Sequence, residues 1–255
     1  MPQKPYGLLC PIAHACELLA PRWTIQVLTE LWSGSTRFND IRRGIGGISP
    51  GLLSKRLREL QAAGLIERIE DKATGAVDYI RTKKGVDLEP ALNALAVWAQ
   101  RNIDAEIALC ETDVSTLMWK MRRWIDVEEL PRRRVVIRFH FHDGGFQYDT
   151  YWVVVQPGAR PEICTSDPGR DVDLFVETTV VSLGGILTGR TSIARELDLG
   201  SLFLSGDARL ARTMDRWLPK SIYSSIDGIA ELPEKRGAGA RRIDVKQNNC
   251  RLRTA

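Results

Sequence analysis

Apolar residues in the first part of the chain recur every three or four positions, the spacing of an amphipathic helix. Three such stretches, separated by polar or glycine-containing breaks, predict short helices over residues 11–20, 22–32 and 37–45. The next start signal is stronger, because Ser49 suits a helix cap and Pro50 suits a first helical turn. Apolar residues at 53, 57 and 60 follow, so we predict a fourth helix that ends at Gly64.

Two strand-like runs come directly after this helix. They cover residues 65–71 and 77–82, and the glycine-containing link at 72–76 predicts a tight hairpin between them. Two helices joined by a short turn and followed by a hairpin form a winged helix-turn-helix. In this arrangement the second helix enters the major groove of DNA, and the hairpin contacts a neighbouring groove or the phosphates.

The basic residues gather where such an element would meet DNA. The net charge of +4 divides into +2 over residues 1–109, −2 over 110–230 and +4 over 231–255. Residues 37–58 alone carry +5, with Asp40 as their one acidic side chain. A solvated basic face on an ordinary helical core would show the same excess, but the helix spacing and the hairpin favour DNA. The predicted DNA contacts are Arg37, Arg42, Arg43, Ser49, Pro50, Gly51, Ser54, Lys55, Arg58, Lys72 and Thr74.

Several short motifs follow one another over residues 8–106. They are CPI at 10–12, RWT at 22–24, RFNDI at 37–41, ISP at 48–50, LSKRL at 53–57 and AGLI at 63–66. Together they resemble the HxlR-type winged-helix transcriptional regulators. The resemblance implies a homodimer on double-stranded DNA, with the helix after Ile48 reading a pseudo-palindromic operator. Family members more often have a polar or charged residue before Arg22, where this chain has Pro21, so the exact helix boundary at this point stays open.

A wide apolar stripe runs through residues 82–107, where we predict one long helix. Leu88, Leu92, Leu95 and Ala99 form the stripe. It can pack onto its own domain or onto a two-fold partner. A dimer would place two recognition helices about 34 Å apart, one turn of duplex.

Cys10 precedes Pro11, so its thiol would lie at a helix N-terminus, where the helix dipole lowers a thiol pKa. Some HxlR-type regulators use a cysteine at this place to sense oxidants or electrophiles, which makes Cys10 a candidate redox thiol. The alternative is a small buried apolar residue. The five cysteines are odd in number and lack a CxxC pair, so we expect free thiols in a reducing cytoplasm.

The pattern changes after Asp113 to mixed helices and strands. It predicts helices over 114–125, 179–187 and 207–218, and strands over 135–141, 148–155, 161–165, 173–178 and 202–204. Helices at both ends of an antiparallel sheet make an α+β fold. We therefore expect a DNA-binding and dimerisation domain over 1–109, a second domain over 110–230, and a basic, disordered tail over 231–255.

The segments LTGR at 187–190 and GSLFLSGDARLA at 200–211 resemble the end of a sterol carrier protein domain. The resemblance covers about residues 110–220 and implies an apolar pocket enclosed by the sheet and helices. Most of the apolar side chains here must be core, and some would line the pocket. The candidates are Trp119, Phe139, Phe141, Tyr151, Trp152, Leu183, Ile186, Leu187, Phe203, Met214 and Trp217.

Other chemistry has little support in the sequence. His140 and His142 share a strand face beside Asp143, but no third metal ligand is evident and we expect no metal. The chain has three histidines and no nucleophile elbow, P-loop or GxGxxG motif, so we expect neither an enzyme nor a cofactor. We also find no secretory signal and no apolar run of roughly 18 residues, and we expect a cytoplasmic protein.

These observations predict a homodimeric transcriptional regulator whose operator affinity is modulated by an apolar small molecule in the second domain. A thiol-based redox regulator acting through Cys10, with a structural second domain, is one alternative. A lipid carrier whose winged helix serves assembly is another.

Overall fold

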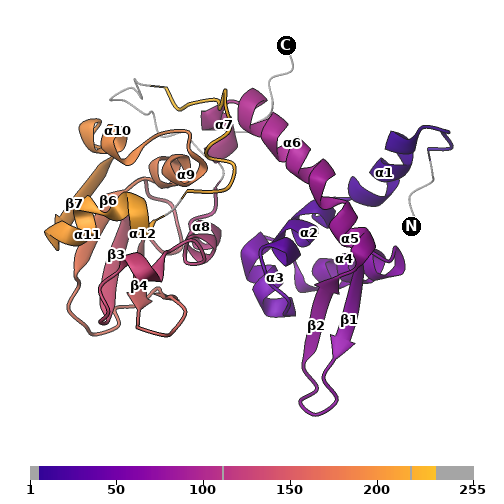
Figure 1. Ribbon diagram of the computed structural model, residues 1–255, viewed down its shortest axis with the longest axis horizontal. Coiled ribbons are helices and arrows are strands. Elements are labelled where there is room, and N and C mark those ends of the chain that lie inside the picture. Colours follow the sequence, from indigo (N-terminus) through magenta and orange to yellow (C-terminus); the bar gives the residue numbers. More distant parts are fainter. Residues whose placement is uncertain (1–5, 111, 219, 234–255) are drawn as a thin grey trace. The chain divides into compact units, whose positions relative to one another are not determined.

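The computed structural model describes residues 6–110, 112–218 and 220–233. The chain divides into two compact units, and the division falls between Asn93 and Ala94, earlier than the boundary at 109 that the sequence predicts. Each unit is described by itself (Figure 1).

The first unit confirms the predicted winged helix-turn-helix. Its helices are α1 (Pro11–Leu19), α2 (Thr24–Trp32), α3 (Phe38–Ile45) and α4 (Pro50–Ala62), followed by strands β1 (Ile66–Glu70) and β2 (Val77–Arg81). The strands form an antiparallel hairpin in which Glu70 lies opposite Val77. The core of the unit consists mainly of side chains from α2, α3 and α4, namely Val27, Leu28, Leu31, Ile41, Leu53, Leu57 and Leu60.

Two breaks before α3 have local causes. Helix α1 ends at Leu19, and Pro21 follows two residues later, where a helix cannot readily continue. Trp23 then takes a left-handed backbone conformation with φ +79° at the cap of α2. The Arg22 guanidinium lies 4.8 Å from the centre of the Trp23 ring, so the indole is packed on that side by a cation.

The single helix predicted over 82–107 is wrong, because this stretch forms three helices. They are α5 (Lys83–Asp87), α6 (Glu89–Asn102) and α7 (Ala105–Leu109). Pro90 lacks an N–H and would clash with a preceding carbonyl, so α5 ends and a new helix starts around it. Asp104 starts α7 by accepting hydrogen bonds from the backbone N–H groups of Glu106 and Ile107.

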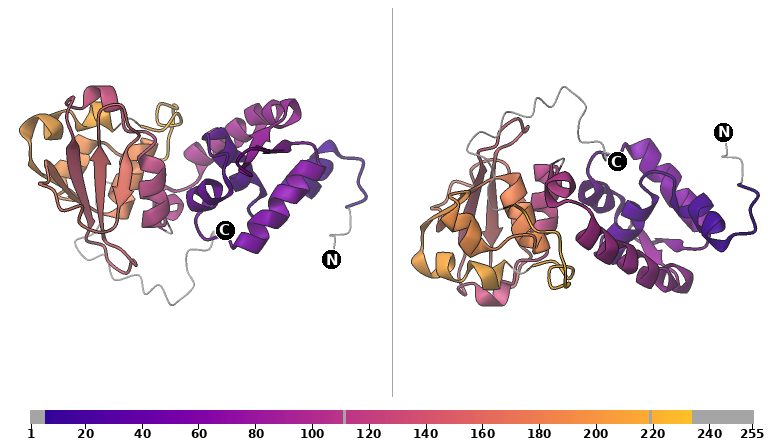
Figure 2. Two further views of the ribbon diagram at one scale, coloured as in Figure 1. Left: turned by 90° about the horizontal axis from the view of Figure 1, so that it is seen from below. Right: turned by 90° about the horizontal axis from the view of Figure 1, so that it is seen from above.

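The second unit is an α+β layer built on a five-stranded sheet (Figure 2). Its strands are β3 (Val135–Phe141), β4 (Thr150–Val155), β5 (Glu162–Cys164), β6 (Leu174–Thr178) and β7 (Leu202–Gly206), in the order β5-β4-β3-β6-β7. Besides α7 and most of α6, its helices are α8 (Val114–Met121), the 3-10 helix η1 (Val127–Glu129), α9 (Val180–Thr188), α10 (Ile193–Asp198), α11 (Ala208–Arg212) and α12 (Met214–Trp217).

The predicted antiparallel sheet is wrong at one pair of strands. β3 and β6 run parallel, with Ile137 beside Leu174, and the other neighbouring strands are antiparallel. After the edge strand β5 the chain crosses to the other side of β3, where β6 pairs with β3 in the parallel direction. The sheet is therefore mixed.

A buried arginine ties the end of the described chain to the second unit. The Arg190 side chain is 3% exposed and donates hydrogen bonds to the carbonyl oxygens of Ile103 (3.0 Å) and Ala230 (2.9 Å). Leu232 donates its N–H to the Arg190 carbonyl and packs with Leu109 of α7. Burial lowers the pKa of Arg190, with Asp104 opposing this effect.

Candidate nucleic-acid interface

The first turn of α4 is fixed by its cap. The Ser49 Oγ accepts a hydrogen bond from the Leu52 N–H at 3.3 Å, and Pro50 occupies the first helical position. Leu53 and Leu57 are almost fully buried, so helical periodicity turns the opposite side outward. The residues at or near that outer side are Pro50, Gly51, Ser54, Lys55 and Arg58, of which Ser54 is half-buried and the others are exposed.

The cations around α4 fall into two groups. Arg56 is half-buried, donates to the Arg22 carbonyl at 2.9 Å and pairs with Glu59, so it holds α4 against the start of α2. The Lys55 Nζ lies 3.9 Å from the Glu59 Oε1, and because both side chains are exposed this ion pair is weak. Arg58 is exposed and makes no hydrogen bond or ion pair with any residue that the structure describes. Its guanidinium is therefore available to an external partner.

Helix α3 and the wing are joined by charged contacts. Arg37 pairs with Asp78 of β2 at 2.8 Å, and Thr36 donates its hydroxyl to the same carboxylate at 2.7 Å. Arg37 thus has a positioning role that the sequence did not reveal. Arg42 and Arg43 are exposed in the last turn of α3.

The tip of the wing is a self-supporting turn. The Asp71 carboxylate accepts hydrogen bonds from the Thr74 hydroxyl and the Ala73 N–H, both at 2.8 Å, and the Thr74 bond is the larger cause of a lowered Asp71 pKa. Gly75 has φ +68°, which a side chain would strain. The Thr74 hydroxyl is committed to the turn, whereas Lys72 is exposed at the tip.

A buried carboxylate supports the helix-turn-helix from within. Glu30 of α2 is 2% exposed and accepts a hydrogen bond from the Ser35 hydroxyl at 2.8 Å. It lies directly against Gly44 of α3, where a Cβ would come within 2.0 Å of the Glu30 Oε1. An acidic residue in an apolar stretch is the only signal that the sequence offered for this contact.

The pocket candidates of the second unit separate into core and surface. Eight of them are fully or almost fully buried in one apolar cluster, namely Phe139, Phe141, Tyr151, Leu183, Ile186, Leu187, Met214 and Trp217. Trp119 and Trp152 are half-buried, and Phe203 is 56% exposed. Burial raises the pKa of Tyr151, and the hydrogen bond with the Ser115 hydroxyl lowers it. Burial is the larger effect, so the Tyr151 pKa is raised.

The cysteines differ from the expectation of five free thiols. Cys10, Cys16 and Cys164 are free, whereas Cys110 is in a disulfide. Wide spacing along a sequence does not keep cysteines apart in space, so the sequence pattern could not exclude this bond. Cys10 is exposed at the N-terminus of α1, which rules out the interpretation of this residue as buried.

Within the described ranges, no group of three or more His, Cys, Asp or Glu side chains is arranged to hold a metal ion. His140 instead lies 3.1 Å from the Thr150 hydroxyl through its Nδ1. No helix in the same ranges is long and apolar enough to cross a membrane.

Comparison with known proteins decides the family. The profile of the HxlR-like helix-turn-helix family matches residues 18–107. The HTH-type transcriptional regulator YvaP of Bacillus subtilis is 33% identical over 98 residues, which cover 38% of this chain and 91% of that protein. This chain belongs to the HxlR-like family. The HTH-type transcriptional regulator YodB of B. subtilis is 30% identical over 107 residues, 41% of this HxlR-like chain and 96% of YodB.

Solved structures of similar sequence also exist. The reduced form of B. subtilis YodB has a TM-score of 0.35 at 31% identity and covers 38% of this chain and 96% of that one. The redox regulator HypR in its oxidized form has a TM-score of 0.35 at 30% identity and covers 37% and 99%. The HxlR-like chain is a DNA-binding transcriptional regulator. The family profile ends at residue 107, so the sterol-carrier resemblance of residues 110–220 stays a prediction.

Proposed function

We propose that this HxlR-like regulator reads its operator with the outer side of α4 and anchors it with the wing. The observation that carries the proposal is the exposed Arg58 without a partner among the described residues, on the same side of α4 as Gly51. A guanidinium can form paired hydrogen bonds with the O6 and N7 acceptors of a guanine. Gly51 has nothing within 4 Å of its would-be Cβ, so the backbone there can approach the DNA closely.

The remaining contacts are assigned to phosphates. Lys72 at the wing tip and Arg42 in α3 have no hydrogen-bond or ion-pair partner among the described residues, and each can neutralise a phosphate. The first turn of α4 adds N–H groups and the positive end of a helix dipole. Arg37 and Thr74 act indirectly in this scheme, since both are occupied by contacts within the protein.

The test compares variants on the DNA upstream of the gene itself. Arg58→Ala should weaken binding by about 1–3 kcal/mol and relax the preference at one base position. Arg160→Ala removes an exposed charge of the second unit and serves as the control. Binding is followed by fluorescence anisotropy at several salt concentrations. Full operator affinity in a Lys55→Ala/Arg58→Ala double variant would show that α4 does not face DNA.

We infer that the regulator acts as a homodimer on a pseudo-palindromic site. Helix α1 is rich in apolar residues, yet none of its residues is buried. Its Ile12 side chain, for example, is 73% exposed. Leu95 and Trp98 of α6 are 56% and 59% exposed. Such apolar surface is usually covered in solution, and a second copy would cover it on both chains at once. Sedimentation equilibrium of the whole chain and of a Trp98→Lys variant tests this, with a monomeric wild-type protein contradicting it.

Control by an apolar effector in the second unit is the corresponding proposal for residues 110–220, and it rests on the resemblance to sterol carrier proteins. Native mass spectrometry of the purified protein tests it, because a bound apolar molecule adds its mass to the folded chain. A bare chain mass, together with unchanged operator affinity on addition of lipids, would contradict it.

Thiol control is the second candidate, favoured by the exposure of Cys10 and its free thiol. Cys10→Ser should abolish any effect of diamide on operator affinity, whereas Cys16→Ser, one turn and a half further along α1, serves as the control. An oxidant response that persists in Cys10→Ser excludes this residue as the sensor.

A further inference from the structure

A small pocket in the second unit lies away from the apolar core. It has a volume of about 170 Å³ and is bounded by η1, by the segment leading into β3, and by the turn that follows β4. The volume is below the roughly 300–1,000 Å³ of pockets for drug-sized ligands. The space therefore suits a small metabolite rather than a lipid.

The walls of this pocket are apolar on several sides. Val127, Pro131, Val155 and Pro157 supply aliphatic surface. Two of these are prolines with a fixed φ angle, so the walls lose little freedom when a ligand binds.

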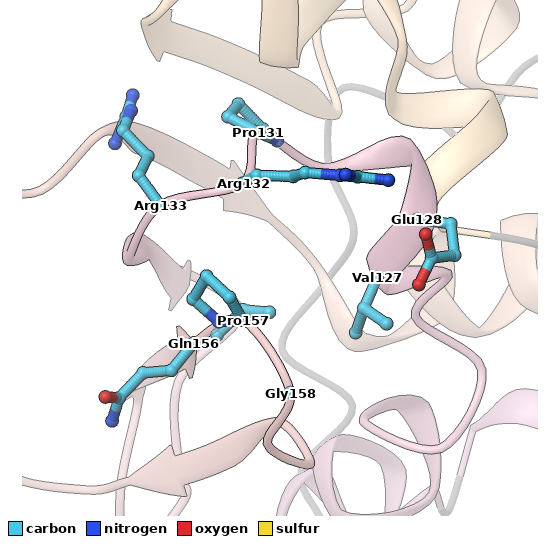
Figure 3. A pocket seen from close by; sticks show the side chains of 9 residues that line it. Val127, Glu128, Pro131, Arg132, Arg133, Gln156, Pro157 and Gly158 are labelled. Atoms are coloured by element: carbon cyan, nitrogen blue, oxygen red, sulfur yellow. The ribbon is translucent and has the colours of Figure 1, made fainter.

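The charged side chains near the pocket differ in whether they have a partner within the protein. Three arginines stand in succession before β3, and two are engaged: Arg133 pairs with Asp173 at 2.6 Å, and Arg134 donates to the Gln156 Oε1 at 2.9 Å. Arg132 has no hydrogen bond or ion pair with any described residue. Figure 3 shows Arg132 reaching across the pocket toward Glu128, whereas Arg133 points away from it.

Neighbouring contacts fix the backbone that follows Arg132. Asp173 accepts a hydrogen bond from the Val136 N–H at 2.8 Å as well as pairing with Arg133, so the segment between them is fixed to the sheet. An arginine without a partner beside apolar walls is a recognition element for carboxylate, because its planar guanidinium donates two parallel hydrogen bonds. Glu128 on the far wall would accept a hydrogen bond from a donor on the same ligand.

We propose that this pocket binds a small organic monocarboxylate that carries a hydroxyl or other donor at its far end. Arg132 binds the carboxylate, Glu128 accepts from the donor, and the prolines and valines contact the body of the molecule. The Glu128 charge disfavours dianions such as hydrogen phosphate, which sets the expected selectivity. The site is independent of the DNA contacts, which lie in the first unit.

The experiment uses the whole chain and 4-hydroxybenzoate as the probe, with saturation-transfer difference NMR as the readout. We expect binding of 4-hydroxybenzoate and none of 4-hydroxybenzamide, which lacks the charge. Arg132→Gln should weaken binding at least tenfold. Arg160→Gln removes the same charge from an exposed position of the second unit that does not line the pocket, and it should change affinity less than twofold. Both side chains are exposed, and thermal unfolding checks that both variants fold.

Three outcomes overturn the proposal. The first is an absence of 4-hydroxybenzoate binding to the wild-type chain. The second is an equal loss in Arg132→Gln and Arg160→Gln, which would mean that only the overall positive charge of the second unit matters. The third is equal binding of the neutral amide. A Glu128→Gln variant that weakens 4-hydroxybenzoate but not benzoate would identify the donor contact and support the proposal.

Discussion

Gly44 offers a sharp test of how the helix-turn-helix is packed. Replacing glycine by alanine inside a helix normally stabilises it by about 1 kcal/mol. At Gly44, however, the new Cβ would lie 2.0 Å from the Glu30 Oε1 and 2.1 Å from the Glu30 Cδ. The buried Glu30 would have to move away from the Ser35 hydroxyl that donates to it.

The two effects oppose each other, and their magnitudes predict the winner. Overpacking a dense core costs about 1–3 kcal/mol. A strained hydrogen bond to a buried carboxylate costs about 1.5–3 kcal/mol. After subtracting the helix gain of about 1 kcal/mol, we expect Gly44→Ala to destabilise the first unit by about 1.5–5 kcal/mol. For a unit of this size, each kcal/mol lowers the unfolding temperature by roughly 4–8 °C, so the expected decrease is at least roughly 6 °C.

The assay is differential scanning calorimetry of the whole chain, with Gly51→Ala as the matched control. Gly51 is also helical but has nothing within 4 Å of its would-be Cβ, so its variant should be neutral or slightly more stable. A Glu30→Ala/Gly44→Ala double variant should lose less stability than the sum of the single changes, because the clash disappears. Equal stability of Gly44→Ala and Gly51→Ala would refute the reasoning.

Two further predictions concern other parts of the chain. Arg190→Met leaves the carbonyl oxygens of Ile103 and Ala230 without their donor and should destabilise the second unit by about 2–4 kcal/mol, measured by urea unfolding; an unchanged midpoint would contradict it. Thr74→Val removes the main cause of the low Asp71 pKa, so that pKa should rise in an NMR titration. The lowered Asp71 pKa stabilises the folded wing at pH values above the unfolded pKa, and this contribution is lost as pH falls through the folded pKa. The wild-type wing should therefore loosen in acid, whereas the stability of the variant, whose folded and unfolded pKa values differ less, should depend less on pH.

The sequence predicted the elements whose signals are local. Ser49-Pro50 and the apolar spacing behind it located α4, and the glycine-containing link located the wing. Pro90 and Asp104 were also visible, but the wide apolar stripe through residues 82–107 obscured the breaks that they cause.

Contacts between segments that are far apart in the sequence could not be predicted from local sequence patterns. Nothing in the alternation of β3 or β6 tells which direction their pairing takes, and so the mixed sheet was missed. In the same way, the net charge of a segment does not distinguish Arg37 from Arg58. Arg37 forms an ion pair with Asp78, whereas Arg58 has no ion-pair partner among the described residues. Apolar side chains of the second unit could be named as a group, but whether each fills a core or lines a cavity depends on neighbours that are far apart in sequence.

The position of the boundary between the units has a practical consequence for dissecting the protein. The boundary falls inside α6, between Asn93 and Ala94, and not in a loop. A fragment ending at residue 109 would keep α7 but remove Val181 and Leu232, against which its buried Ala105 and Leu109 pack. Such a fragment would carry a newly exposed apolar helix and tend to aggregate. DNA binding by the first unit is better studied with a fragment that stops before α7, or with the whole chain.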